Sequence, residues 1–246
     1  QNDEDIQAGE RVFYTARNAR YLDTARALLE QVDVRLKPLL LAPLIAKASV
    51  HVNTSGVFKG FYKCTKTGKG KFGGNGSNAL SRITADISLE LPVFSRFECE
   101  WQAYRSDINS LVKSLPAVDV AYLDPPYNQH PYGSNYFMLN LLVDYREPQS
   151  LSRVSAIPAD WRRSAYNSRA SAHESMRQLV RDTNASHVLV SFNNEGFIRR
   201  EDMEEMLAGL GRVQTLAVDY NTFRGSRNLG GRSLHVQEFL FVVEKK

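Results

Sequence analysis

The sequence predicts an α/β protein whose mixed sheet ends in an antiparallel hairpin. Two runs, VDVAYL at 118–123 and SHVLVSF at 186–192, are rich in β-branched residues and end in turn residues, as buried strands do. The last two runs, VQTLAVDY at 213–220 and SLHVQEFLFVV at 233–243, alternate around a glycine-rich connection. This alternation is typical of a terminal β-hairpin.

Helical patterns precede and separate these strands. In the first 50 residues, RNARYLDTARALLEQVD has apolar residues at three- and four-residue spacings, and LKPLLLAPLIAKASVHV predicts a turn followed by a buried helix. Residues 164–184 predict a polar helix, and residues 201–210 predict another. In RFECEWQAY, Phe97, Cys99 and Trp101 alternate on one face, which predicts a further strand at 96–104.

Composition sets the outer bounds of the function. With 246 residues and 43% hydrophobic content, the chain can bury a sizeable core. The balance of 31 Lys and Arg against 27 Asp and Glu is only +4, a weak argument for a polyanionic partner. No apolar run approaches a membrane span, and we expect a soluble, cytoplasmic protein. Cys64 and Cys99 have no metal-ligand spacing and the five histidines do not cluster, so we expect reduced thiols and no metal site.

The first strand stops abruptly at Asp124, Pro125, Pro126 and Tyr127. Two prolines cannot donate to a sheet and fix the backbone, so the acid and the aromatic are held at the carboxyl end of the strand, where open α/β sheets bind ligands. Tyr127 offers a face on which a nucleic-acid base could stack, and Asp124 and the Pro125 carbonyl offer acceptors for its exocyclic amine. The alternative is a Pro-Pro turn whose acid caps the next element.

DPPY continues as NQHPYGSNYFMLNLL at 128–142, and the chain also contains NTSGVFKGFYK at 53–63, VLVSFNNEGF at 188–197 and YNTFRGSRN at 220–228. With these motifs it resembles the D12 class of N6-adenine-specific DNA methyltransferases. The resemblance implies a class I, Rossmann-like methyltransferase fold with a helical target-recognition lobe. It places target recognition in residues 1–96 and catalysis in residues 97–246.

The activity that this resemblance implies is methyl transfer from S-adenosylmethionine to the N6 amine of an adenine flipped out of double-stranded DNA, in a restriction–modification system. Asp124, Pro125, Pro126 and Tyr127 would be catalytic, and Asp124 would also face the cofactor. In the family an acid at the place of Asp107 contacts the adenine of the cofactor. By its position alone, just beyond a predicted strand, Asp107 could equally be the N-cap of a helix.

Two basic segments are candidates for DNA contact. Between residues 58 and 82 no acid occurs, and aromatic residues interleave with the lysines, a mixture suited to phosphates and stacking. A solvated flexible loop is the alternative, and the Walker spacing of a nucleotide-phosphate loop is missing. A second set lies on the glycine-rich tip of the terminal hairpin. The candidates are Lys59, Lys63, Lys66, Lys69 and Lys71, with Arg224 and Arg227.

One part of the family pattern is absent. No glycine motif follows a predicted strand, and no acid ends a second strand to hold the ribose. The chain therefore resembles the C-terminal two thirds of such an enzyme, and we expect the N-terminal part of the sheet to be missing. A cognate restriction enzyme or a missing N-terminal half is an expected partner.

Alternatives to this function remain at the level of sequence. The chain could be a DNA-binding fragment or a split-enzyme subunit that is inactive by itself. The same tetrad could serve N4-cytosine or an amino group in RNA. A structural or partner-binding α/β protein with an accidental DPPY is a third interpretation.

Overall fold

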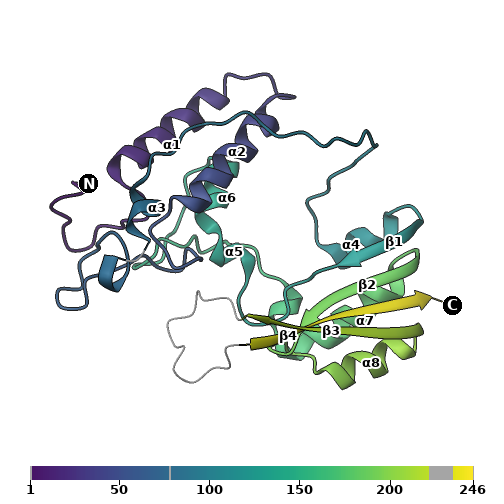
Figure 1. Ribbon diagram of the computed structural model, residues 1–246. Coiled ribbons are helices and arrows are strands. Elements are labelled where there is room, and N and C mark those ends of the chain that lie inside the picture. The colour runs from purple at the N-terminus through teal and green to yellow at the C-terminus, as the bar shows by residue number, and fades with distance from the viewer. Residues whose placement is uncertain (1, 78, 222–234, 246) are drawn as a thin grey trace. The chain divides into compact units, whose positions relative to one another are not determined.

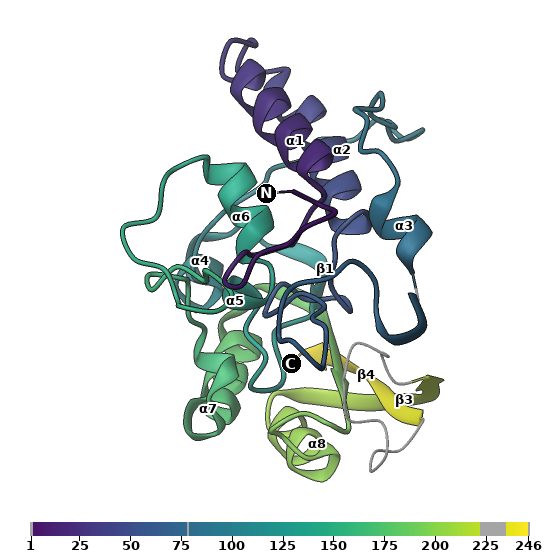
Figure 2. The same cartoon turned by 90° about the vertical axis from the view of Figure 1, so that its left-hand side faces the viewer.

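The computed structural model describes residues 2–77, 79–221 and 235–245. The chain forms two compact units, one of Gln1–Cys99 with Tyr132–Arg162 and one of Glu100–Pro131 with Arg163–Lys246 (Figures 1 and 2). The predicted regions 1–96 and 97–246 divide the chain differently, because residues 132–162 join the first unit. The functions assigned to those two regions stay predictions.

The second unit is built on a mixed sheet of four strands (Figure 1). The strands lie in the order β1-β2-β4-β3, with β1 and β2 parallel and β4 antiparallel to both of its neighbours. The strands predicted at 118–123 and 186–192 and the antiparallel terminal pair are therefore confirmed, whereas the Rossmann-like class stays a prediction. The bounds are β1 (Val118–Leu123), β2 (Ala185–Asn193), β3 (Gly211–Asn221) and β4 (His235–Lys245).

Two helices cover one face of this sheet. Alternate residues of β2, namely Val188, Val190 and Phe192, are buried beneath α7 (Arg169–Asp182) and α8 (Arg200–Ala208). These two helices confirm the helical predictions at 164–184 and 201–210. Three shorter helices complete the unit: α4 (Ile108–Leu111), η2 (Val112–Ser114) and η3 (Ala165–Asn167).

The opposite face of the sheet carries apolar side chains that remain exposed. The pairing register aligns Tyr122, Leu189 and Val242 in one row across three strands. Tyr122 is 60% exposed, and of the six residues of β1 only Leu123 is buried. The prediction that residues 118–123 form a buried strand was therefore wrong about burial. The reason is that β1 has a single described neighbour and both covering helices lie on the other face.

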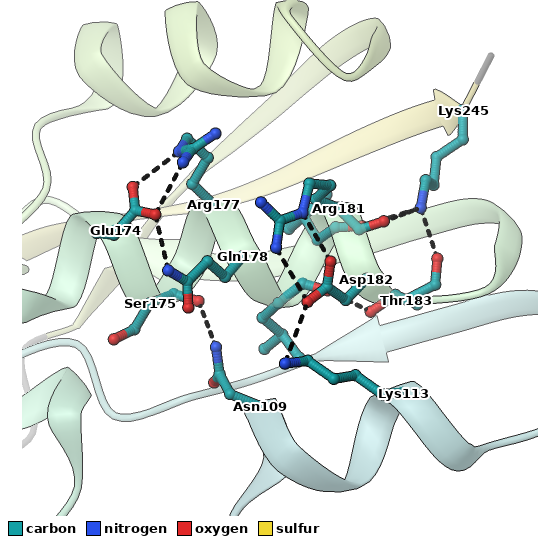
Figure 3. A network of polar contacts seen from close by, with 12 residues as sticks. Asn109, Lys113, Glu174, Ser175, Arg177, Gln178, Arg181, Asp182, Thr183 and Lys245 are labelled. Atoms are coloured by element: carbon teal, nitrogen blue, oxygen red, sulfur yellow. Dashed lines mark hydrogen bonds and ion pairs between the residues drawn. The ribbon is translucent and has the colours of Figure 1, made fainter.

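A polar network fixes α7 against the rest of the unit (Figure 3). At its C-terminal end, where helix carbonyls lack intrahelical partners, Lys245 Nζ donates to the carbonyls of Val180 and Arg181 at 3.1 and 2.8 Å. At its middle, Asn109 Nδ2 donates to the Ser175 carbonyl at 2.8 Å. The network joins α7 to β4 and to the α4 segment that leads into β1.

The first unit is mainly helical around an aromatic core. Both helices predicted in the first 50 residues are present, and Thr15 caps the first of them by accepting from the backbone N–H of Asn18. The prediction of burial for the second helix was wrong, because only Leu44 and Ala48 of its 14 residues are buried. The rings of Phe13, Phe58 and Phe137 form a cluster of tilted and edge-on contacts. The helices are α1 (Ala16–Leu29), α2 (Lys37–Val50), η1 (Asn75–Ser77), α3 (Leu80–Thr84), α5 (Tyr132–Asn135) and α6 (Phe137–Asp144).

The strand predicted at residues 96–104 does not form. The chain is neither helix nor strand there, and Phe97 and Trp101 are 83% and 84% exposed. Alternation of apolar residues makes a strand only where a neighbouring strand supplies hydrogen bonds. No strand among the described residues pairs with this segment, so that prediction was wrong.

Candidate active site

The DPPY tetrad follows directly on the last residue of β1. Because β1 and β2 are parallel, their carboxyl ends lie at the same edge of the sheet. The segment that follows β2, residues 194–198, therefore lies beside residues 124–127. The structure brings these two segments together through the contacts of Tyr127.

Asp124 offers an unengaged carboxylate at this edge. Its side chain is exposed, and within the described part of the chain no hydrogen bond or ion pair engages it. Pro125, by contrast, is buried, so the backbone on which the carboxylate stands is packed in place. An exposed acceptor on a fixed backbone can take a hydrogen bond from a ligand without first breaking one of its own.

Tyr127 is held by two contacts from the β2 side. Its ring lies 5.7 Å from the ring of Phe192 at an interplanar angle of 64°, an edge-on arrangement. Its carbonyl accepts from the backbone N–H of Phe197 at 2.8 Å. Gly196, next to Phe197, packs closely on the ring of Phe192, since a Cβ added there would lie 2.2 Å from that ring. Tyr127 is half-buried, which leaves part of the ring accessible to a ligand.

The residue after the tetrad is anchored from a different element. Asn167, at the end of η3, donates from its side-chain Nδ2 to the backbone carbonyl of Asn128 at 2.7 Å. Sequence reasoning assigned no role to Asn167. Nothing in the sequence signals this contact, because the two residues are 39 positions apart and share no regular element.

Asp107 is the N-cap of α4, as the structural alternative predicted. Its carboxylate accepts from the backbone N–H of Ser110 at 3.1 Å, and the side chain is exposed. The neighbouring Asn109 accepts from the hydroxyl of Tyr166 at 2.7 Å, and burial raises the pKa of Tyr166, which keeps that hydroxyl a donor. The role of Asp107 in cofactor binding stays a prediction.

The five candidate lysines lie in the first unit, and all of them except Lys59 lie on a hydrogen-bonded turn. Lys63 and Gly70 form an antiparallel bridge, and Cys64 N–H donates to the Lys69 carbonyl at 2.9 Å. We call residues 62–71 the basic hairpin. Buried Asn53 supports it by donating to the Lys71 carbonyl at 2.8 Å.

The lysine ammonium groups differ in their surroundings. Lys63 lies over the ring of Phe61 at 5.0 Å, and Lys71 donates to the Gly74 carbonyl at 3.1 Å. Lys59, just before the basic hairpin, is exposed as a whole, but desolvation lowers the pKa of its ammonium. Lys66 is exposed on the turn itself. A cationic surface with a fixed backbone follows, which is suited to phosphates.

Other sequence predictions concern Arg224 and Arg227, which lie outside the described residues. In the part of the chain that the structure describes, no group of three or more His, Cys, Asp and Glu could hold a metal ion. A search of the same residues finds no helix long and apolar enough to cross a membrane.

Comparison with known proteins defines the class. The candidate site is a tetrad of an acid, two prolines and an aromatic residue at the carboxyl end of a strand in a mixed sheet. The family model of the D12 class N6 adenine-specific DNA methyltransferases matches residues 3–206. The chain belongs to this family, which confirms the predicted class of enzyme. No solved structure matches the chain significantly.

Its relatives include Type II methyltransferase M.NlaIII of Neisseria lactamica, 27% identical over 96% of this chain and 68% of the relative. Modification methylase StsI of Streptococcus sanguinis is 29% identical over 97% of this chain, and Type II methyltransferase M.FokI of Planomicrobium okeanokoites is 26% identical over 96%. The chain spans only 35% of each of the latter two.

Proposed function

We propose that this chain carries the catalytic tetrad of a DNA methyltransferase that transfers a methyl group from S-adenosylmethionine to the N6 amine of adenine. The observation that carries the proposal is the exposed Asp124 carboxylate, which has no partner among the described residues, beside a Tyr127 that is fixed on two sides. Family membership supports adenine as the target base.

A base inside a duplex cannot reach a tetrad at the edge of a sheet, so the target adenine is rotated out of the stack. Tyr127 then stacks on the flipped base, while Asp124 and the Pro125 carbonyl accept hydrogen bonds from its N6 amine. These contacts hold the nitrogen still and aim its lone pair. The residues act by positioning and by electrostatic alignment, without a covalent intermediate on the protein.

S-adenosylmethionine, when bound, supplies the methyl group as an electrophile on its sulfonium sulfur. The residues of this chain fit such a cofactor in the chemistry of their acceptors. Asp107 is exposed and uses its carboxylate only to cap α4 among the described residues, so it can also accept from an adenine amine. Asp124, which accepts from the target amine, would also contact the cofactor. The nitrogen loses its proton to solvent after transfer, so no general base is required.

Double-stranded DNA is the proposed macromolecular substrate. The lysines of the basic hairpin, with Lys59, would neutralise phosphates. Arg224 and Arg227 are further candidates for phosphate contact from their sequence alone. The relatives carry the names of type II methyltransferases and modification methylases. These names support a place for the chain in a restriction–modification system.

We further propose that this activity needs a missing N-terminal half. Two features support it: β1 has no described strand on its outer edge, and the sheet face with Tyr122, Val218 and Tyr220 is exposed. An unpaired parallel edge and an uncovered apolar face both accept further strands and helices. A split-enzyme subunit that is inactive by itself is therefore the second candidate.

The test compares Asp124→Ala with the matched control Asp119→Ala, an exposed carboxylate on the same strand. Both variants are made in the full product of the gene and assayed for methyl transfer to unmethylated DNA and for DNA binding. We expect Asp124→Ala to lower turnover at least a hundredfold, on the order of the loss of a positioned catalytic contact, with DNA affinity unchanged. Near wild-type turnover in Asp124→Ala would refute the assignment.

A further inference from the structure

The tetrad is followed by a backbone carbonyl that a distant side chain holds. The Tyr127 carbonyl accepts from Phe197 N–H at 2.8 Å, and the next carbonyl, that of Asn128, accepts from Asn167 Nδ2 at 2.7 Å. Two successive peptide groups at the end of the tetrad are thus fixed from two different elements. A backbone held at two successive points cannot rotate about the bonds between them without breaking a hydrogen bond.

The turn that carries Asn167 is itself anchored. The side chain of Ser164 caps η3 by accepting from Tyr166 N–H, and Tyr166 is 4% exposed. The Tyr166 hydroxyl lies 2.7 Å from Asn109 Oδ1 and 3.2 Å from the Ser175 carbonyl. The turn that carries Asn167 is therefore hydrogen-bonded, through Tyr166, both to α7 and to the α4 segment.

The amide of Asn167 has one orientation in this setting. Its Oδ1 is buried and has no hydrogen-bond donor within the described part of the chain, so the Nδ2 bond to Asn128 is what fixes the side chain. Because Nδ2 faces a carbonyl oxygen, an amide donor is required there. A carboxylate of the same shape would place oxygen against oxygen.

We propose that Asn167 is a positioning residue for methyl transfer, which acts through the Asn128 carbonyl to hold the DPPY segment in its reactive geometry. The inference rests on the proposed function of that tetrad. Asn167 touches neither the transferred methyl group nor the base in this account. Its loss lets residues 124–128 move, and a displacement of about 1 Å at a reacting group can lower a rate about a hundredfold.

The first arm of the experiment does not depend on activity. Amide hydrogen exchange of Phe197 reports directly on its bond to the Tyr127 carbonyl, in the protein without DNA or cofactor. We expect Asn167→Ala and the isosteric Asn167→Asp each to speed exchange of Phe197 and of residues 127–130 about tenfold. Ser171→Ala, which removes a bond to the Ala165 carbonyl in the same turn, is the matched control and should leave both unchanged.

The second arm measures methyl transfer in the full product of the gene. We expect Asn167→Ala and Asn167→Asp to lower kcat, referred to the concentration of folded enzyme, tenfold or more with little change in the KM for DNA. Unfolded protein would lower the apparent kcat in the same way, so the folded fraction of each variant is measured. Circular dichroism checks that each variant is folded, and the isosteric Asn167→Asp serves if the alanine variant is not.

The outcomes separate the two proposals. Wild-type exchange at Phe197 in a folded Asn167→Asp variant would overturn the positioning role, whatever the activity. Faster exchange with no methyl transfer even in the wild type would show that Asn167 anchors the DPPY backbone and would refute the proposed function. Faster exchange together with an unchanged kcat would also overturn the inference, because the anchored geometry would then not matter for transfer.

Discussion

Replacement of Arg26 by alanine should destabilise the first unit more than any surface change. Arg26 lies on α1 with its side chain 4% exposed, and its guanidinium donates to two backbone carbonyls at the C-terminal end of α6, those of Leu142 at 2.5 Å and Val143 at 3.2 Å. The last carbonyls of a helix have no intrahelical partner. Arg26 supplies the missing donors and ties α1 to α6.

The size of the expected destabilisation can be estimated from the groups that lose the Arg26 guanidinium as a partner. Two carbonyls that lose their donor cost about 1–2 kcal/mol each when they stay buried. The guanidinium also lies 4.6 Å from the centre of the Tyr145 ring, a cation–π contact worth about 1 kcal/mol. The ion pair with Glu30 adds little, since that carboxylate is 48% exposed. We expect a loss of about 3–5 kcal/mol in the free energy of unfolding.

Urea denaturation followed by circular dichroism measures this loss, with two transitions fitted because the chain has two units. Arg17→Ala is the matched control, since Arg17 lies on the same helix, is 77% exposed and pairs only with Asp86 among the described residues; we expect a change within about 0.5 kcal/mol. The loss of unfolding free energy in Arg26→Lys should lie between those of Arg17→Ala and Arg26→Ala, because one ammonium group cannot reproduce the planar set of donors of the guanidinium. A loss below about 1 kcal/mol in Arg26→Ala would refute the reasoning.

Two further predictions concern the basic hairpin. Replacing both Lys63 and Lys66 by alanine should reduce the slope of the logarithm of the DNA-binding constant against the logarithm of the salt concentration by about 1.8. An unchanged slope would exclude phosphate contacts by these two lysines. Alkylation of Cys64 should reach half its maximal rate near pH 7. Hydrogen bonds from the Thr67 side chain and from the Thr67 and Lys66 backbone lower the pKa of the Cys64 thiol to about 7. The reactive thiolate is therefore present at a lower pH than in an ordinary cysteine. Thr67→Val should raise the pH at which alkylation is half-maximal, and bound DNA should protect the thiol. A wild-type midpoint at about pH 8.5, the ordinary pKa of a thiol, would show that these hydrogen bonds do not lower the pKa of Cys64.

Helices and strands that short stretches of sequence specify by themselves could be predicted. The strand before DPPY, the strand at 185–193 and the terminal pair all combine β-branched residues with turn residues at their ends, and each is present. The helix at 16–29 follows from the spacing of its apolar residues, and the helix at 37–50 follows from a continuous apolar segment with a proline near its start. For the same reason the tetrad could be located from sequence, because its four residues are contiguous.

Features that depend on contacts with residues distant in the sequence could not be predicted from local patterns. Residues 96–104 have the alternation of a strand, but a strand exists only when another strand pairs with it, and none of the described strands does. Burial of residues 118–123 failed for a related reason, since a run of apolar residues does not reveal whether anything covers it. The anchors of the tetrad, Phe197 and Asn167, were missed because each meets it across more than 30 residues of chain.

The central claim is that the tetrad at the end of β1 methylates adenine in DNA. The most direct measurement supplies labelled S-adenosylmethionine and unmethylated mixed-sequence DNA to the 246-residue chain and to the full product of its gene, and then identifies the labelled nucleoside. The account predicts label in N6-methyladenine, formed by the full product and lost in Asp124→Ala. Label in N4-methylcytosine, or no label from either protein, would contradict it.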